Sequence, residues 1–235
     1  MLCSNIYMNI NAEQQADKDY TLLITEYAQK LNDGHVLISA TDTLISYFAQ
    51  YTPQGYSKLL EYTQDKQDTT TMPIMYYAPK NNTNILIQLL GRHPTTLERI
   101  LLDTFIPHII LITQKADGSK IAIRSTHLKI LQDILTQASG ALYTLELNLL
   151  KIKSDEVKRL ADVTMITNQY TELNLNTYSN LHSCIVDITR ITHDQYIDNT
   201  ILIEHDYAID MQKLSTIALE HGLSYKITPS SMIEK

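Results

Sequence analysis

The stretch His35-Val36-Leu37-Ile38-Ser39-Ala40-Thr41-Asp42-Thr43 decides the fold class. Its first six residues form a short run with the length and flanks of a buried β-strand, directly after a helical pattern. The run ends in the polar tripeptide Thr41-Asp42-Thr43, and ligands gather at such carboxyl strand ends in open α/β sheets. Two hydroxyls and a carboxylate there indicate a site for a small polar substrate. An ordinary Asx or ST turn is the alternative interpretation.

Outward from this strand, the spacing of apolar residues predicts helices and strands that alternate along the chain. The helices are expected at 13–33, 54–62, 83–90, 94–102, 128–137, 154–160 and 210–221. The strands are expected at 35–40, 72–77, 109–112, 121–123, 141–149, 163–166, 184–188 and 201–203. Interleaved elements without long runs of one kind favour an α/β fold with a mixed sheet, in a single domain with the last helix on its outside.

Composition excludes several classes of protein. The chain has 235 residues, 44% of them hydrophobic, which is enough for the core of one sizeable domain. Only 6 glycines occur, and neither G-x-G-x-x-G nor G-x-x-x-x-G-K-[ST] is present, so Rossmann and P-loop nucleotide sites are excluded. The formal net charge of −7 argues against general binding of phosphate backbones, so nucleic acid would need a locally basic cleft.

Membrane and metal binding are not expected either. No apolar run approaches the roughly 20 residues that span a bilayer, and the N-terminus does not resemble a signal peptide, so we expect a cytoplasmic protein. The two cysteines, Cys3 and Cys184, form no C-x-x-C pair, and the eight histidines show no metal-binding spacing. The sequence therefore predicts no metal site.

Four further residues are candidates for binding, each with a simpler alternative. Lys66, in a polar loop, could neutralise phosphate, although most loop lysines are only solvated. Arg124 ends a strand and suits either a carboxylate or phosphate clamp or a structural ion pair. Asn148 lies among leucines and needs a hydrogen-bonding partner unless it faces solvent. Ser183 precedes a strand and by itself is a typical loop residue.

Taken in order, these segments resemble the motifs of the YrdC/Sua5 family. The family's P-T-D-T-x-Y-G-L is similar to Ala40-Thr41-Asp42-Thr43-Leu44-Ile45-Ser46, and its K-x-R-P-x-x-x-P-L to the segment from Lys66 to Ile74. Its V-A-V-R resembles Ile121-Ala122-Ile123-Arg124, and its S-x-N-x-S-G keeps only the asparagine, Asn148. The best single match is S-T-[IV]-V-D-[LI]-T with Ser183-Cys184-Ile185-Val186-Asp187-Ile188-Thr189.

The resemblance implies a fold and an activity. Enzymes of this family make threonylcarbamoyl-AMP from threonine, bicarbonate and ATP, for the modification of adenosine 37 in tRNA. Their YrdC/RibB-like fold has a mixed, strongly twisted sheet with flanking helices around a positively charged cavity. The resemblance implies such a domain over residues 10–210, followed by a C-terminal helix and tail over residues 211–235. ATP would be a substrate, with or without Mg²⁺, and no tightly bound cofactor is expected; proteins of tRNA modification are the implied partners.

The resemblance also assigns substrate-binding residues, although it singles out no catalytic one. They are Thr41, Thr43, Lys66, Lys115, Arg124, Asn148 and Ser183. In this assignment Lys66 contacts phosphate, Thr43 and Ser183 contact threonine, Arg124 contacts a carboxylate or phosphate, and Asn148 contacts the nucleotide. Lys115 is one of the neighbouring lysines that would supplement the positive charge of the site.

Three of the positions that depart from the family's pattern bear most on activity. The arginine of K-x-R is Asp68, and a serine of the S-x-N segment is Glu146. The final L-R-x-G either corresponds to Leu202-Ile203-Glu204-His205, with Ile203 in place of the arginine, or is lost outright. Exchange of arginine for aspartate changes the local charge by two units where the family meets ATP. The alternative function is therefore a catalytically degenerate protein of the same fold that serves as a binding or partner module.

Overall fold

The fold is a ten-stranded mixed sheet flanked by helices. The structure, a computed structural model, describes residues 16–42, 45–61, 73–76, 83–138, 140–146, 163–165, 183–191, 199–204 and 209–227. The strand order is β10-β9-β8-β4-β5-β3-β6-β2-β1-β7. The strands are β1 (Leu37–Ala40), β2 (Ile45–Gln50), β3 (Pro73–Tyr76), β4 (Ile109–Gln114), β5 (Lys120–Ser125), β6 (Ala141–Glu146), β7 (Val163–Met165), β8 (Cys184–Asp187), β9 (Thr200–Glu204) and β10 (Ser224–Ile227). The helices are α1 (Ala16–Asn32), α2 (Pro53–Glu61), α3 (Asn84–Leu90), α4 (Thr96–Phe105), α5 (Lys129–Gln137) and α8 (Met211–Glu220).

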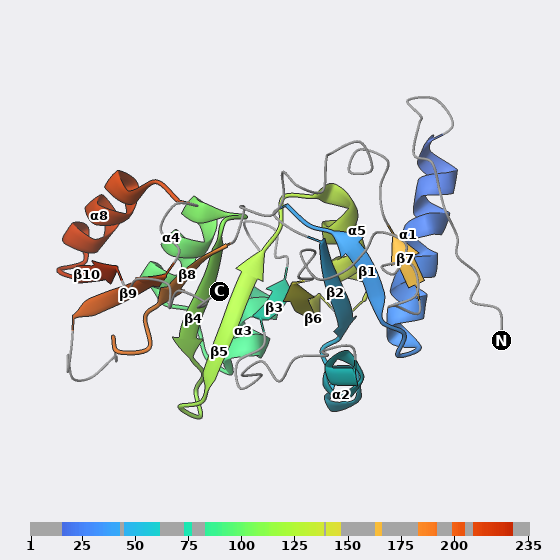
Figure 1. The fold of residues 1–235 in the computed structure, drawn as a ribbon, viewed down its shortest axis with the longest axis horizontal. Helices are drawn as coiled ribbons and strands as arrows, with labels where there is room; N and C mark the ends of the chain where they lie inside the picture. Colours follow the sequence, from blue (N-terminus) through green and yellow to red (C-terminus); the bar gives the residue numbers. More distant parts are fainter. Residues whose placement is uncertain are drawn as a thin grey trace, which may run out of the picture.

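The sheet is strongly twisted. Strand β2 is antiparallel to β6, β6 is antiparallel to β3, and β3 is parallel to β5, so β2 and β5 would point the same way in a flat sheet. In Figure 1 the arrow of β2 points down and the arrow of β5 points up. Because successive strands rotate in one sense, the rotation accumulates across β6 and β3, and the two strands point opposite ways in this view. In a flat sheet the C-terminal ends of β1 and β5 would point in opposite directions and lie far apart. The twist brings these two strand ends together.

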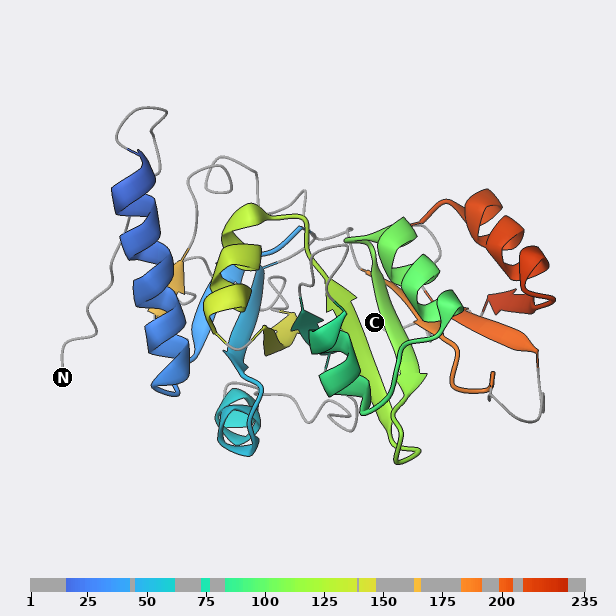
Figure 2. The same cartoon turned by 180° about the vertical axis from the view of Figure 1, so that it is seen from behind.

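Two apolar cores lie on opposite faces of the sheet. Helices α1 and α5 pack on Leu37, Phe48 and Leu142 of β1, β2 and β6. Helices α3, α4 and α8 pack around Leu111 and Ile123 of β4 and β5 and their neighbours. In the register, Leu142 is level with Met75 and Met75 with Arg124, so Leu142 and Arg124 lie on one face and Ile123 on the other. Figure 2 shows α3, α4 and α5 on one side of the molecule nevertheless, because the sheet twists between them.

Local sequence explains where the best-defined helices begin. Thr95 is the N-cap of α4: its hydroxyl accepts a hydrogen bond from the Glu98 N–H, and the Glu98 carboxylate accepts one from the Thr95 N–H. The sequence offers Thr95 and Thr96 as capping candidates, and this capping box identifies Thr95 as the cap. Asp210 caps α8 through the N–H groups of Gln212 and Lys213. Such caps satisfy N–H groups that have no partner inside the helix.

Most of the predicted elements are confirmed to within a few residues, and the α/β fold with a mixed, twisted sheet and flanking helices is confirmed as a whole. Two strands were not predicted. Strand β2 carries Ser46 and Gln50 among apolar residues, and β10 is short and exposed. The helix predicted at 154–160 lies outside the described residues. In the described part of the chain, no helix combines the length and apolar character required to cross a bilayer.

The C-terminal helix is more integrated than a helix packed on the outside of a domain. Leu214, Ile217 and Ala218 of α8 belong to the same core as α3 and α4. Strand β10 then pairs in parallel with β9 and extends the sheet. Residues 211–227 are thus continuous with the rest of the fold.

Candidate functional site

The carboxyl ends of β1 and β5 meet at a polar junction. The Asp42 carboxylate accepts one hydrogen bond from the Thr126 hydroxyl and another, of 3.1 Å, from the His127 N–H. In the register the end of β1 is level with the start of β5, so the twist of the sheet is what places Asp42 beside Thr126. Thr41, next to Asp42, is fully buried. The polar tripeptide at the end of β1 is therefore held against the segment that starts α5.

Arg124 is the second-to-last residue of β5, two residues before Thr126, and its side chain has no exposed surface. Its face of β5 also carries Lys120, and the same face continues through Ile112 of β4 to Asp187 of β8. We call this face of β5, β4 and β8 the Arg124 face. The Lys120 Nζ lies 3.7 Å from the Asp187 Oδ2 on it. A buried guanidinium keeps its charge and needs hydrogen-bond acceptors around it, so Arg124 makes this face a place for anionic or carbonyl oxygen atoms.

Ser183 is brought to the same edge by β8. It is 3% exposed, and the N–H of the next residue, Cys184, donates a 2.8 Å hydrogen bond to the His108 carbonyl. Strand β8 is parallel to β4, and β4 is antiparallel to β5. Continued past the last paired residues, this register puts Ser183 level with His108 and Thr126. Three segments far apart in the sequence, at Thr41, Arg124 and Ser183, thus converge on one end of the structure.

Buried hydroxyl groups form a second polar feature, which sequence reasoning missed. Ser39, Ser46 and Thr144 lie on β1, β2 and β6, on the face that packs against α1 and α5, and each is at most 1% exposed. Within the described part of the chain, the Ser46 Oγ and the Thr144 Oγ1 have no hydrogen-bond partner. Buried oxygen atoms without partners are uncommon and costly, so these two are acceptors and donors available to a polar ligand. The sequence signal that could have revealed these buried hydroxyls is a serine or threonine within an otherwise apolar strand.

Of the remaining predicted residues, the structure describes only Lys115. Thr43, Lys66 and Asn148 lie outside the described residues. Lys115 is described, but it follows the last residue of β4, at the opposite end of that strand from His108. Its Nζ lies 3.7 Å from the Asp117 Oδ2 in the β4–β5 turn. The structure therefore separates Lys115 from Thr41, Arg124 and Ser183, because strands of this length carry a side chain far from the strand's other end.

Ile203 takes the place of the family's final arginine if the L-R-x-G motif corresponds to residues 202–205 rather than being lost outright. It is fully buried in the core with α3, α4 and α8, on the face of β9 that meets Val186 of β8. That core face is the reverse of the Arg124 face. An arginine at this position would place a charge among apolar side chains, which explains why an isoleucine fits it.

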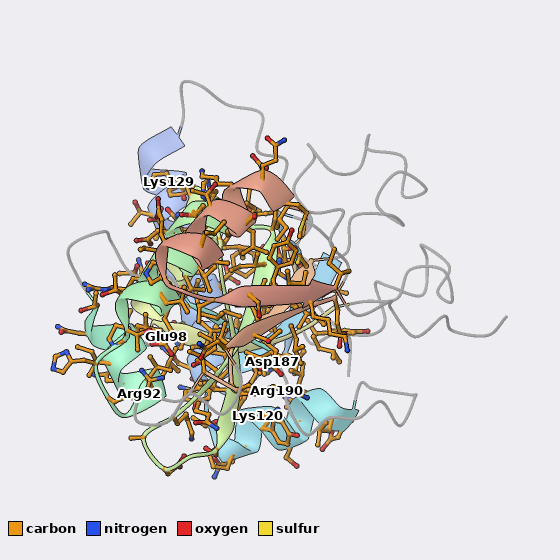
Figure 3. The ribbon with its side chains drawn as sticks, turned by 90° about the vertical axis from the view of Figure 1, so that its left-hand side faces the viewer. Arg92, Glu98, Lys120, Lys129, Asp187 and Arg190 are labelled. Atoms are coloured by element: carbon orange, nitrogen blue, oxygen red, sulfur yellow. The ribbon has the colours of Figure 1, made fainter. Side chains whose placement is uncertain are left out.

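A buried ion pair lies at the N-terminus of α4, away from the junction (Figure 3). Glu98 is 1% exposed, and its carboxylate accepts hydrogen bonds of 2.9 and 2.6 Å from Arg92. It also accepts bonds from the Thr113 hydroxyl, at 2.5 Å, and from the Thr95 N–H, at 2.6 Å. Burial alone would raise the pKa of Glu98, but the hydrogen bonds from Arg92, Thr113 and Thr95 outweigh it and hold that pKa below its ordinary value. Sequence reasoning found the cap at Thr95 but not this pair.

Metal ligands do not gather anywhere in the described ranges. Among residues 16–227, with the gaps given above, no three His, Cys, Asp or Glu side chains lie close enough to share an ion. The polar groups of the candidate site are the hydroxyls of Thr41 and Ser183, the Asp42 carboxylate and the Arg124 guanidinium.

Known structures with this fold include a threonine-binding protein. The structure of P. abyssi Sua5 complexed with L-threonine is similar at a TM-score of 0.61 and 10% identity, over 86% of this chain and 58% of that one. A variant of P. abyssi Sua5 matches at 0.61 and 12%, over 85% and 56%. A hypothetical protein from Streptococcus mutans UA159 matches at 0.59 and 8%, over 88% and 94%. No protein-family model and no curated protein matches the sequence.

The chain therefore has a YrdC/Sua5-like fold, as its sequence motifs predicted. It is similar in particular to P. abyssi Sua5, of which it spans somewhat more than half the length. The likeness is one of fold, because the two sequences share only 10 to 12% of their residues.

Proposed function

We propose that this protein binds threonine and joins it to bicarbonate and ATP to form threonylcarbamoyl-AMP. The convergence of Thr41, Arg124 and Ser183 at one end of a Sua5-like fold is the observation that carries the proposal. These three residues come from three family motifs that are widely separated in the sequence. Their convergence is expected if the motifs are remnants of one substrate site.

The residues of this site match the groups of threonine. A guanidinium such as that of Arg124 binds a carboxylate with two parallel hydrogen bonds. The hydroxyls of Thr41 and Ser183 would meet the amino and hydroxyl groups of the amino acid, since a hydroxyl both donates and accepts. Asp42 has its carboxylate engaged by Thr126 and His127, so its role is to position Thr41 rather than to contact substrate.

The proposed chemistry proceeds in two balanced steps. The threonine nitrogen forms a bond to the bicarbonate carbon, and water leaves, which gives a carbamate. An oxygen of the carbamate then attacks the α-phosphorus of ATP, and pyrophosphate leaves with the electrons of the broken P–O bond. ATP enters as a substrate, with Mg²⁺ as its counter-ion. The protein's contribution is to hold the reactants close together and to offset the negative charge of the phosphates.

Calorimetry with threonine tests the binding half of the proposal. The Thr41→Val variant should lose about tenfold in threonine affinity, and Thr41→Ser should keep most of it, because only the second retains a hydroxyl. Arg124→Lys, which keeps the charge, should bind more weakly than the native protein but better than Arg124→Gln. Arg99→Gln, on the exposed side of α4, is the matched control and should bind as the native protein does. Equal affinity in the native protein and all five variants would reject the proposed site.

A pyrophosphate-release assay with threonine, bicarbonate and ATP tests the chemical half. Release that requires all three substrates, and that falls with Thr41→Val, supports the synthase. Circular dichroism and thermal unfolding of each variant separate loss of function from loss of fold.

A second function, binding without turnover, is favoured by one observation. Ile203 lies in an apolar core on the side of the sheet opposite Arg124, so β9 supplies no cation to this end of the structure. Together with Asp68 in place of the family's arginine, this weakens the case for a triphosphate more than the case for threonine. Threonine binding without pyrophosphate release would identify a binding module that acts with proteins of tRNA modification.

A further inference from the structure

A separate cavity of about 390 Å³ lies where the N-terminus of α4 meets the ends of β4 and β8. Its lining includes Glu98 of α4, Lys115 after β4, Ile188 after β8 and Leu223 after α8. We call it the α4 pocket. Strand β4 runs between this pocket and the edge that holds Ser183, a span of roughly 20 Å for six residues. The α4 pocket is therefore distinct from the candidate threonine site.

The Glu98 carboxylate in the pocket wall is already saturated. Both of its oxygens accept two hydrogen bonds each, from Arg92, Thr113 and the Thr95 N–H, at distances between 2.5 and 2.9 Å. Arg92 also neutralises its charge, and donates to the Gln114 carbonyl at 2.6 Å. A ligand in the pocket would meet a neutral, fully paired cluster at this wall rather than a free carboxylate.

Lys115 gives the pocket its positive charge. Its side chain is 30% exposed, and the carboxylate near it, that of Asp117, is 3.7 Å away on a side chain that is 64% exposed. Asp117 is not part of the pocket lining. A loose pair of this kind at the surface is weak, so the ammonium group can turn to an anion inside the pocket at little cost.

The opposite wall is apolar and comes from three elements. Leu97 of α4, Ile188 after β8 and Leu223 before β10 are each at most 9% exposed, and Ile191 is half-buried beside them. The lining as a whole is mixed, with polar residues from α4 and the end of β4 beside these aliphatic side chains. The aliphatic wall favours a ligand with an aliphatic body.

We propose that the α4 pocket binds a small carboxylate with an aliphatic tail, with the carboxylate at Lys115 and the tail against Leu97, Ile188 and Leu223. The inference does not depend on the proposed synthase activity, since the two sites share no residue. It adds to the protein a second ligand site at the far end of β4.

Nuclear magnetic resonance with hexanoate as the probe tests the proposal. Hexanoate should shift the amide signals of Ala116, Thr189 and Leu223, and hexylamine and 1-hexanol should shift them far less, because they lack the anionic head. Lys115→Gln should weaken hexanoate binding by roughly fivefold, the loss expected for one partly exposed ion pair. Lys213→Gln, on the exposed side of α8, is the matched control and should bind hexanoate as the native protein does.

Three outcomes would overturn the proposal. They are an absence of shifts at the pocket amides, equal shifts with hexylamine, and unchanged affinity in Lys115→Gln. Lys115 lies in an exposed turn region, so its substitution leaves the core intact and each result can be read. A threonine titration of the same Lys115→Gln sample keeps the two sites apart: threonine affinity should stay at its native value, whether or not pyrophosphate is released.

Discussion

Asp42 and Thr126 are 84 residues apart in the sequence, and the Thr126 hydroxyl donates a hydrogen bond to the Asp42 carboxylate. This bond joins the C-terminal end of β1 to the segment that leads into α5. It also fixes Thr41, which precedes Asp42 and is buried. The geometry of the candidate site thus depends on a contact that neither residue's neighbours in the sequence could provide.

We expect this bond to stabilise the fold measurably. Asp42→Ala and Thr126→Val should each lower the free energy of unfolding by about 1.5–3 kcal/mol, the range for hydrogen bonds to charged groups. Both variants remove the bond between Asp42 and Thr126, and Asp42→Ala also removes the bond from the His127 N–H. The double variant should therefore cost little more than Asp42→Ala alone, and a double-mutant cycle should give a coupling of about 1 kcal/mol. Urea unfolding measures all three. Asp103→Asn, on the exposed side of α4, serves as control, and strictly additive effects would contradict the bond.

Glu98 predicts how stability depends on pH. Its pKa in the folded protein is lowered, so in the folded state it binds its proton less tightly than in the unfolded chain, where the pKa is about 4.3. Its contribution to stability is therefore fully present above that value and is lost as the pH falls through the lowered pKa. Glu98→Gln should be less stable than the native protein by about 3 kcal/mol at pH 7, and the difference should shrink in acid. Urea unfolding at several pH values measures it; a constant difference would show that Glu98 is not ionised in the fold.

The place of α8 in the core predicts a contrast between two leucines of one helix. Leu214 is fully buried, and Leu219 is 76% exposed. Leu214→Ala should cost about 3 kcal/mol, as expected for a buried leucine, and Leu219→Ala should cost almost nothing. Guanidinium unfolding in a single transition with a lower midpoint for Leu214→Ala would show that α8 unfolds with the rest of the sheet. An unchanged midpoint would mean that residues 211–227 are an appendage.

Gly140 and Gly118 predict a second contrast. Both have φ of +82°, where a side chain is strained by about 1–2 kcal/mol. A Cβ at Gly140 would also lie 2.8 Å from the Ile85 Cγ1, whereas a Cβ at Gly118 would meet nothing within 4 Å. Gly140→Ala should therefore destabilise the protein by more than Gly118→Ala. Adding Ile85→Ala to Gly140→Ala should recover part of this difference. Thermal unfolding of the native protein, the two glycine variants and the double variant measures these losses of stability; equal losses in the two glycine variants would show that backbone strain alone sets the cost.

Local pattern was enough for most elements because apolar spacing reports burial directly. The run Cys184–Ile188 illustrates this: its alternation and flanks predicted β8, and the structure gives Cys184–Asp187. The same kind of pattern did not predict β2, because Ser46 and Gln50 interrupt its apolar residues, although Ser46 is fully buried. Strand β10 was missed because all four of its residues are exposed, so burial leaves no trace in its sequence.

The site was predictable only in part. The motifs indicated Thr41, Arg124 and Ser183 one by one, and the structure brings them to one end of the sheet. The resemblance implied a strongly twisted sheet, but local composition reports neither which residues the twist joins nor the separation of Lys115 along β4, because both follow from how the strands are ordered. The Arg92–Glu98 pair could have been found in part, since Thr95 and Glu98 have the spacing of a capping box.

The twist of the sheet across β6 and β3 has a consequence for the order of folding. The end of β1 cannot reach the start of α5 until the strands between them, β2, β6, β3 and β5, have entered the sheet in register. Such long-range closure is slow, because chain entropy is lost before the contact is gained. We therefore expect the junction of Asp42 with Thr126 to form late in folding, and its amide protons to exchange earlier than those of the two cores. A chain with this fold could lose its site while its sheet remains whole.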